Sequence, residues 1–127
     1  MAERKIKVIL VKPGEKARIE TIDATLENYQ AIVGGIIQVV YPWEDPVGLV
    51  CNDEGKLLCL PYNRALQDEN GRVYDAICGT FFICGLGEED FGGLSDALAE
   101  KYEKLFHNVQ RFNEVMGKIL VTEIVDD

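Results

Sequence analysis

Two polar runs near the middle of the chain hold residue types that bind small molecules. The first is Cys51-Asn52-Asp53-Glu54-Gly55-Lys56, and the second is Tyr62-Asn63-Arg64. Arginine offers a planar fork for carboxylate or phosphate, asparagine both donates and accepts hydrogen bonds, and tyrosine stacks. We therefore predict a binding site for a small polar ligand or a peptide at Asn52, Tyr62, Asn63 and Arg64. In the alternative, the two asparagines bond to backbone at turns and Arg64 pairs with a local acid.

Catalytic chemistry has little support among the other side chains. His107 is the one histidine and falls within an expected helix, whereas Ser-His-Asp and Cys-His catalysis need a histidine presented to a nucleophile. No two cysteines have the C-x-x-C spacing of zinc and thioredoxin sites, so we expect free thiols in apolar strands. The cysteines are Cys51, Cys59, Cys78 and Cys84. We predict no catalytic residue, metal ligand or cofactor. An enzyme that works without histidine, through carboxylates or tyrosine, is the alternative.

A glycine-rich and acidic stretch, residues 85–93, precedes the second expected helix. Its glycines, Gly85, Gly87, Gly92 and Gly93, give it a superficial likeness to a phosphate-binding loop. The intervening acids, Glu88-Glu89-Asp90, would repel phosphate, and no P-loop lysine follows. We therefore predict a loop, with a flap over the polar binding site as the function to test.

Length and charge limit the classes of function that the chain can serve. Its 127 residues and 47% hydrophobic content fit one globular domain over residues 1–127. The net charge of −9 argues against direct binding to nucleic-acid phosphates or anionic membrane surfaces. No apolar run approaches the roughly 20 residues of a membrane span, and no signal-peptide segment follows the charged N-terminus. We expect a cytoplasmic protein.

The first half of the chain predicts strands around one short helix. Hydrophobic alternation and turn residues place the strands at Arg4–Val11, Ala17–Ile22, Ile36–Tyr41, Val47–Cys51 and Leu57–Leu60. Thr25 is the expected N-cap of a helix over Leu26–Val33, which Gly34 ends in a left-handed conformation. Gly55 is expected to take the left-handed position of a tight turn before the last of these strands.

The second half predicts a polar connection at 61–72, a long apolar stretch at 73–86, a long helix and a final strand. Apolar residues at three- and four-residue spacing extend the helix from its N-cap, Ser95, to about Met116. The final strand covers Lys118–Val125. This order of elements predicts an α+β single domain. We expect an antiparallel or mixed sheet, with one short and one long helix packed on one face.

Five short motifs occur in a specific order along the chain. They are Val33-Gly34-Gly35, Asn52-Asp53-Glu54-Gly55-Lys56-Leu57, Pro61-Tyr62-Asn63-Arg64, Ile77-Cys78-Gly79 and Phe91-Gly92-Gly93-Leu94. Together they resemble the family catalogued as domain of unknown function 3846, over roughly residues 6–106, with residues 107–125 outside the resemblance. The resemblance implies an origin in bacteria, phages or mobile elements and recurrent polar positions at Asn52, Gly55, Asn63 and Arg64. It brings no assigned activity.

Two functional hypotheses follow. The first is a non-enzymatic binding module for a small polar ligand or a peptide at the four predicted site residues. The second is an acidic interaction or inhibitor protein of a mobile element, which acts on a basic, DNA-binding host partner and resembles DNA in its charge. It rests on the net charge and on the acidic stretches Glu88-Glu89-Asp90 and Asp126-Asp127.

Overall fold

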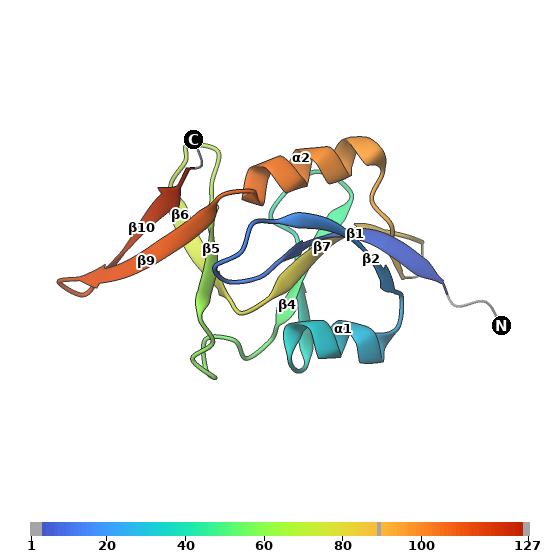
Figure 1. Ribbon diagram of the computed structural model, residues 1–127, viewed down its shortest axis with the longest axis horizontal. Helices are drawn as coiled ribbons and strands as arrows, with labels where there is room; N and C mark the ends of the chain where they lie inside the picture. The colour runs from blue at the N-terminus through green and yellow to red at the C-terminus, as the bar shows by residue number, and fades with distance from the viewer. Residues whose placement is uncertain (1–3, 89, 126–127) are drawn as a thin grey trace.

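An antiparallel sheet forms the middle of the molecule in the computed structural model, which describes residues 4–88 and 90–125 (Figure 1). Its strands lie in the order β2-β1-β7-β4-β3, and β8 pairs with the end of β7. Their bounds are Lys5–Val11 (β1), Arg18–Asp23 (β2), Ile37–Val40 (β3), Val47–Asn52 (β4), Phe81–Leu86 (β7) and Phe91–Gly92 (β8). Three of the acids that motivated the second hypothesis, Glu89, Asp126 and Asp127, lie outside the described residues.

The two helices cover opposite faces of this sheet (Figure 1). Because side chains alternate along a strand, Val8 and Leu10 of β1 pack with α1 (Leu26–Val33), while Ile9 and Val11 pack with α2 (Asp96–Phe106). The expectation that both helices pack on one face is therefore wrong. A sheet covered on both faces needs apolar residues at consecutive positions, as β7 has throughout residues 81–84.

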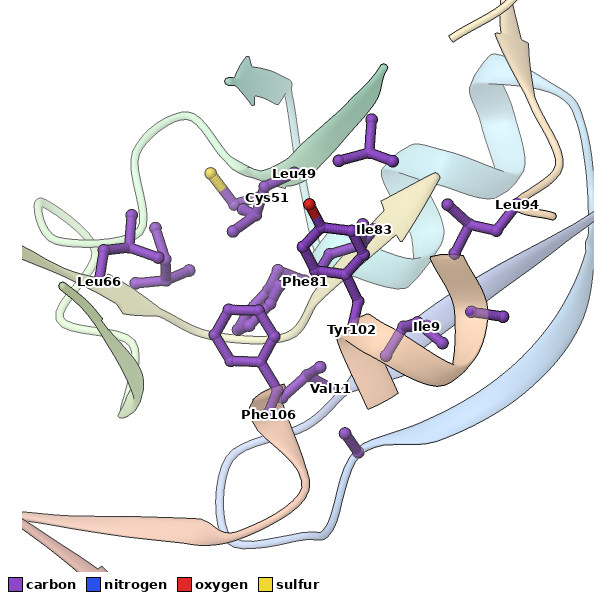
Figure 2. Close-up of a cluster of buried hydrophobic side chains, with 14 residues drawn as sticks. Ile9, Val11, Leu49, Cys51, Leu66, Phe81, Ile83, Leu94, Tyr102 and Phe106 are labelled. Atoms are coloured by element: carbon purple, nitrogen blue, oxygen red, sulfur yellow. The ribbon is translucent and has the colours of Figure 1, made fainter. Parts of the chain in front are cut away.

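The larger of the two cores lies between the sheet and α2. Figure 2 shows Tyr102 and Phe106 of α2 beside Phe81 and Ile83 of β7. Phe106 meets Phe81 edge-on, with ring centroids 5.4 Å apart. Leu66, from outside the central sheet, belongs to the same core, so the layers form one domain.

Two antiparallel ribbons flank the central sheet. β5 (Tyr62–Gln67) pairs with β6 (Val73–Cys78), and β9 (Val109–Val115) pairs with β10 (Lys118–Ile124). The β9–β10 hairpin packs against β5 and extends beyond the rest of the molecule (Figure 1). In its turn, Met116 at φ 53° and Gly117 at φ 80° take the two left-handed positions of a type I′ turn.

The class predicted from the sequence is confirmed: the fold is α+β, and all its strand pairs are antiparallel. The predicted bounds of α1 are also correct. The Thr25 hydroxyl accepts from the Asn28 N–H at 3.1 Å, and Gly34 ends the helix at φ 81°. Ser95 caps α2 as predicted, since its hydroxyl accepts from the Leu98 N–H at 3.2 Å. None of the helices in the described residues is long and apolar enough to cross a membrane.

Several predictions in the middle and second half are wrong. Residues 57–59 form turns instead of a strand, and the stretch 61–72, predicted as a connection, contains β5. α2 ends at Phe106, and the remainder of the predicted long helix is β9. Gly55 does not have the predicted left-handed conformation. It is needed there because a Cβ would lie 2.7 Å from the carbonyl oxygen of Cys78.

Candidate functional site

Asn63 and Arg64, two of the four predicted site residues, lie inside the fold and are both 0% exposed. The Asn63 side-chain amide donates to the carbonyl oxygens of Val11 and Gly79, each at 2.9 Å. Its own oxygen accepts from Arg64 at 3.0 Å. Asn63 therefore bonds β5 to the end of β1 and to the residue pair that precedes β7, and both polar atoms of its side chain have protein partners.

Arg64 links three segments through their backbone carbonyls. Its Nε donates to Phe106 at 3.1 Å, one terminal nitrogen to Glu15 at 2.7 Å, and the other to Asn63 at 3.1 Å. Phe106 is the last residue of α2, so the guanidinium satisfies a carbonyl that the helix leaves free, and its charge suits that end of the helix. Burial lowers the pKa of Arg64 to about 10, so the side chain stays charged at neutral pH.

Asn52 has a similar role at the end of α1. Its amide nitrogen donates to the Val33 carbonyl at 3.1 Å, and its oxygen accepts from the Glu54 N–H at 2.8 Å. These bonds satisfy a carbonyl in the last helical turn and shape the turn that follows β4. A hollow of about 330 Å³ opens beside Asn52, and Lys56 and Asp75, which pair with each other, also line it.

Tyr62 lies at the surface, 40% exposed, and its ring stacks on Phe112 of β9 with centroids 5.0 Å apart. The structure therefore does not bring Asn52, Tyr62, Asn63 and Arg64 into one pocket. Both asparagines bond to backbone as the structural alternative proposed, while Arg64 bonds to carbonyls instead of an acid. Ligand binding by these residues stays a prediction, and the open surface that it needs exists only beside Asn52 and Tyr62.

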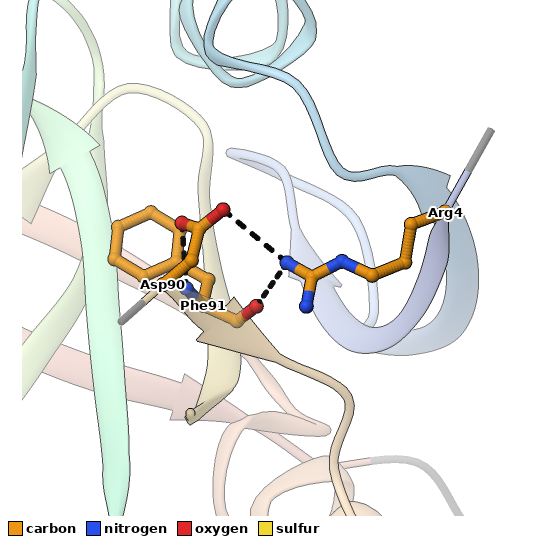
Figure 3. A network of polar contacts seen from close by, with 3 residues as sticks. All are labelled: Arg4, Asp90 and Phe91. Carbon is orange, nitrogen blue, oxygen red and sulfur yellow. Dashed lines mark hydrogen bonds and ion pairs between the residues drawn. The ribbon is translucent and has the colours of Figure 1, made fainter. Parts of the chain in front are cut away.

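The described residues of the 85–93 stretch are tied to the rest of the fold. One terminal nitrogen of Arg4 donates to the Phe91 carbonyl at 2.6 Å and to the Asp90 carboxylate at 3.3 Å (Figure 3). A Cβ at Gly85 would lie 2.6 Å from the Gly93 carbonyl oxygen, so glycine allows the close approach of two segments. Gly85 and Leu86 are the last two residues of β7, and the rest of the stretch follows them. Asn63 bonds to Gly79, before the first residue of β7, so it lies at the opposite end of this strand from the stretch.

The histidine has a protein partner, and three of the four cysteines are buried. His107 Nδ1 lies 2.8 Å from the Glu103 carboxylate on the preceding turn. Cys51 and Cys84 are buried, and burial raises the pKa of the first thiol to about 11 and of the second to about 12. Both thiols are therefore protonated and weakly reactive at neutral pH. Within residues 4–88 and 90–125, no three His, Cys, Asp or Glu side chains gather in a group that could hold a metal ion.

An open groove beside α2 gathers aromatic and acidic side chains. Its volume is about 920 Å³, near the upper end of the roughly 300–1,000 Å³ typical of ligand sites. We call it the Trp43 groove. Trp43 and Tyr74 supply its accessible aromatic rings, while Tyr102, which also lines it, is fully buried. Its carboxylates belong to Glu44, Asp45, Asp68 and Glu69. Among the described residues that line it, Lys101 alone is basic.

Contacts with α2 fix one wall of the Trp43 groove. The Trp43 ring centroid lies 4.7 Å from that of Tyr102 and 5.8 Å from that of Phe106. Asp45 accepts from Lys101 at 2.5 Å and from the Tyr102 hydroxyl at 2.7 Å. The Lys101 hydrogen bond, followed by that of Tyr102, lowers the pKa of Asp45. Burial, followed by Asp45, raises the pKa of Tyr102, so a charged acid and a neutral phenol persist at neutral pH.

The other carboxylates of the groove differ in how much of their bonding capacity is used. Asp68 accepts from the backbone N–H groups of Asn70 and Arg72, each at 2.9 Å, and so shapes the turn between β5 and β6. Glu44 and Glu69 are exposed, and within the described part of the chain neither makes a hydrogen bond or an ion pair. These two glutamates are the carboxylates most available to a partner.

The sequence prediction missed the groove. Trp43 lies between the predicted strands Ile36–Tyr41 and Val47–Cys51, and Asp68 and Glu69 lie in the predicted polar connection at 61–72. The available signal was the single tryptophan of the chain, which lies between a proline and two acids in Pro42-Trp43-Glu44-Asp45. A tryptophan in an acidic loop has a large apolar surface to cover, and its indole binds cations.

The sheet, the helices on both its faces and the buried polar side chains define a strand-rich α+β domain. Residues 6–107 match the model of the family described as domain of unknown function (DUF3846), and the chain belongs to this family. The resemblance expected from the ordered motifs is thereby confirmed. The match ends directly after α2, which leaves the β9–β10 hairpin outside it. No curated protein and no solved structure matches the chain.

Proposed function

We propose that this protein is a non-enzymatic binding domain that holds a basic peptide segment of a partner in the Trp43 groove. The observation that carries the proposal is the composition of the Trp43 groove, where aromatic rings lie among four carboxylates. Lysine and arginine side chains have the chemistry that such a surface binds, because both the ring faces and the carboxylates attract cations.

Charge supports this choice of partner at two scales. The whole chain has a net charge of −9, and four carboxylates against one lysine leave the groove with a formal charge of −3. Lys101 already pairs with Asp45, so Glu44 and Glu69 meet a partner without competition from a basic residue of the groove. Charges of one sign in a cleft steer an oppositely charged partner toward it and favour the correct orientation of that partner.

The aromatic residues add contact area and specificity. Tyr74 is 57% exposed, and Trp43 is held by its contacts with α2. A cation over an exposed aromatic ring contributes about 0.5–1 kcal/mol, and a rigid ring loses little conformational entropy on binding. Phosphate groups and anionic lipids meet repulsion at the same place.

The source of the basic segment is a further part of the proposal. We place the protein in the cytoplasm of a bacterium, as the product of a phage or mobile element, and its partner among the basic, DNA-binding host proteins. The family resemblance and the acidic surface support this setting, and free thiols are usual in a reducing compartment. A pull-down from bacterial lysate at low salt that recovers no basic protein would count against it.

A second candidate keeps the small polar ligand and places it in the hollow beside Asn52. The specific observation is that a hollow of about 330 Å³ has the Lys56–Asp75 ion pair on its wall. A thermal-shift screen over nucleotides and small anions tests it, since a ligand of the folded state alone raises the melting temperature. Retention of every shift in a Lys56→Met variant would remove this hollow as the site.

The main proposal is tested by titrating the protein with a capped heptapeptide of alternating lysine and alanine. Trp43 is the single tryptophan, so the fluorescence of the protein reports on binding beside this residue. We expect saturable binding that weakens by roughly tenfold or more between about 20 and 300 mM salt, because screening shortens the reach of exposed charges. The glutamate counterpart of the peptide is expected to leave the emission unchanged.

Two double variants with equal changes in net charge distinguish the effect of the groove carboxylates on binding from the effect of the overall negative charge. Glu44→Gln with Glu69→Gln removes the two unpaired carboxylates of the groove and is expected to weaken binding at least about fivefold. Glu27→Gln with Glu114→Gln removes two acids from α1 and β9, outside the groove, and is expected to change it less than about twofold. Equal effects of the two pairs would reject the groove as the site.

A further inference from the structure

A smaller hollow adjoins the Trp43 groove. Trp43, Gln67 and Leu105 line both, so the two spaces meet along these residues. Its volume is about 250 Å³, below the roughly 300 Å³ at which pockets for drug-sized ligands begin. A space of this size suits one long side chain better than a whole ligand. We call it the Glu123 hollow.

The walls of the Glu123 hollow are partly apolar and partly polar, with Gln67 and Gln110 among the polar residues, and its charge comes from one residue. Val73, Leu105 and Val121 supply aliphatic surface, and Trp43 supplies a ring. Of the described residues that line the hollow, Glu123 alone is charged. Within the described part of the chain it forms no ion pair, since the neighbouring Arg64 directs its guanidinium to backbone carbonyls and to Asn63.

Aliphatic walls and a lone carboxylate match one kind of side chain. Lysine has an apolar stem of four methylenes and a compact cationic head, and it places the stem on apolar surface while its head keeps polar contacts. A short cation would leave the aliphatic walls uncovered, and an uncharged stem would leave Glu123 without a partner. Both the length and the charge of the inserted side chain therefore contribute to binding.

We infer that the Glu123 hollow is a specificity pocket for one lysine-type side chain of the basic segment bound in the Trp43 groove. This inference rests on the proposed function and deepens it. The groove attracts the basic segment, and the hollow selects the residue at one position of it. The occupant is a long aliphatic cation, and charge complementarity with Glu123 defines it.

The test uses three capped peptides that differ only at the central residue of Lys-Ala-Ala-X-Ala-Ala-Lys. X is lysine, norleucine, which has a similar stem without charge, or diaminopropionic acid, which has the charge on a short stem. Each is titrated against the full chain, with the fluorescence and the indole N–H resonance of Trp43 as readouts. We expect the lysine peptide to bind at least about tenfold more tightly than either of the others.

The Glu123→Gln variant keeps the shape of the residue and removes its charge. In it, lysine and norleucine peptides are expected to bind within about twofold of each other, while Glu114→Gln, a control on the same hairpin, keeps the full preference. Equal binding of the lysine and diaminopropionic acid peptides, or an unchanged preference in Glu123→Gln, overturns the pocket and leaves the groove standing. If none of the three peptides binds, both proposals fail.

Discussion

Arg64 joins several segments that are far apart in the sequence. Its guanidinium donates to carbonyls of Glu15, Asn63 and Phe106 and is fully buried. A buried acceptor that loses its partner keeps the cost of its own dehydration, about 1–3 kcal/mol each. Replacing Arg64 therefore affects a loop, a strand and a helix end together.

We predict that Arg64→Met lowers the free energy of unfolding by about 3 kcal/mol or more, because a side chain of similar length then leaves these carbonyls unpaired. Arg64→Lys is expected to fall between this variant and the wild type, because an ammonium group cannot reach all of these acceptors with a fixed fork. Urea unfolding followed by Trp43 fluorescence measures both.

Arg72→Met is the matched control, since Arg72 is exposed and its side chain makes no hydrogen bond or ion pair within the described residues. It is expected to change the free energy of unfolding by less than about 0.5 kcal/mol. An Arg64→Met protein as stable as the Arg72→Met control would show that the carbonyl network adds little.

The same residues show the limit of sequence prediction at this scale. Tyr62-Asn63-Arg64 was predicted from the sequence as part of a ligand site, but the side chains of Asn63 and Arg64 form their hydrogen bonds inside the fold. Buried polar groups are stable only with partners, and those of Arg64 lie as far away as 49 residues, at Glu15. Backbone carbonyls exist at every residue, so no local sequence pattern shows which of them a buried arginine will bond. The Trp43 groove was not predicted for a related reason, because its residues come from several separate segments.

At the scale of elements, the helix that has capping residues at both ends was predicted with its correct bounds. α1 has Thr25 and Gly34 as caps, and both cap residues bond to backbone groups of the same helix. α2 has such a signal only at Ser95, and the carbonyl at its other end is bonded by Arg64 from another strand. Phe112 continues the helical spacing of apolar residues, yet it stacks on Tyr62 from β9. Tertiary contacts therefore decided where the helix ends.

The β9–β10 turn holds a residue that its conformation does not favour. Met116 has φ 53° and is 97% exposed, so it gives the turn strain and little packing. Asparagine tolerates the left-handed region and is the usual residue before glycine in a type I′ turn. We predict that Met116→Asn stabilises the hairpin by about 0.5–1 kcal/mol, seen as slower hydrogen exchange of the amides in residues 109–124.

Gly117→Ala is the opposite control, because a side chain at φ 80° adds strain at the next turn position. It is expected to speed exchange in the same amides. If Met116→Asn also speeds exchange, the methionine must have a contact in solution that outweighs its backbone strain.

At the scale of the whole molecule, exposed ion pairs connect α2 to the rest of the fold. Lys7 of β1 pairs with Asp96 at its start, and Lys101 pairs with Asp45 in the loop that also contains Trp43. Exposed pairs contribute little at neutral pH. Their contribution is nevertheless pH-dependent, because the Lys7 hydrogen bond lowers the pKa of Asp96 and that of Lys101 lowers the pKa of Asp45.

We predict that these pairs make the fold sensitive to acid and that Asp45→Asn reduces this sensitivity. The pKa of Asp45 in the folded state lies below its ordinary value of 3.8, so the unfolded chain takes up the proton first as the pH falls. The stabilisation is therefore present above that ordinary value and is lost as the pH falls through the folded-state pKa. Asparagine keeps an acceptor for the Tyr102 hydroxyl but does not titrate, so the free energy of unfolding should fall less steeply below about pH 4 than in the wild type.

Glu27→Gln, which removes one charge from α1, is expected to follow the wild-type slope. A slope for Asp45→Asn as steep as that of the wild type would assign the acid sensitivity to other carboxylates.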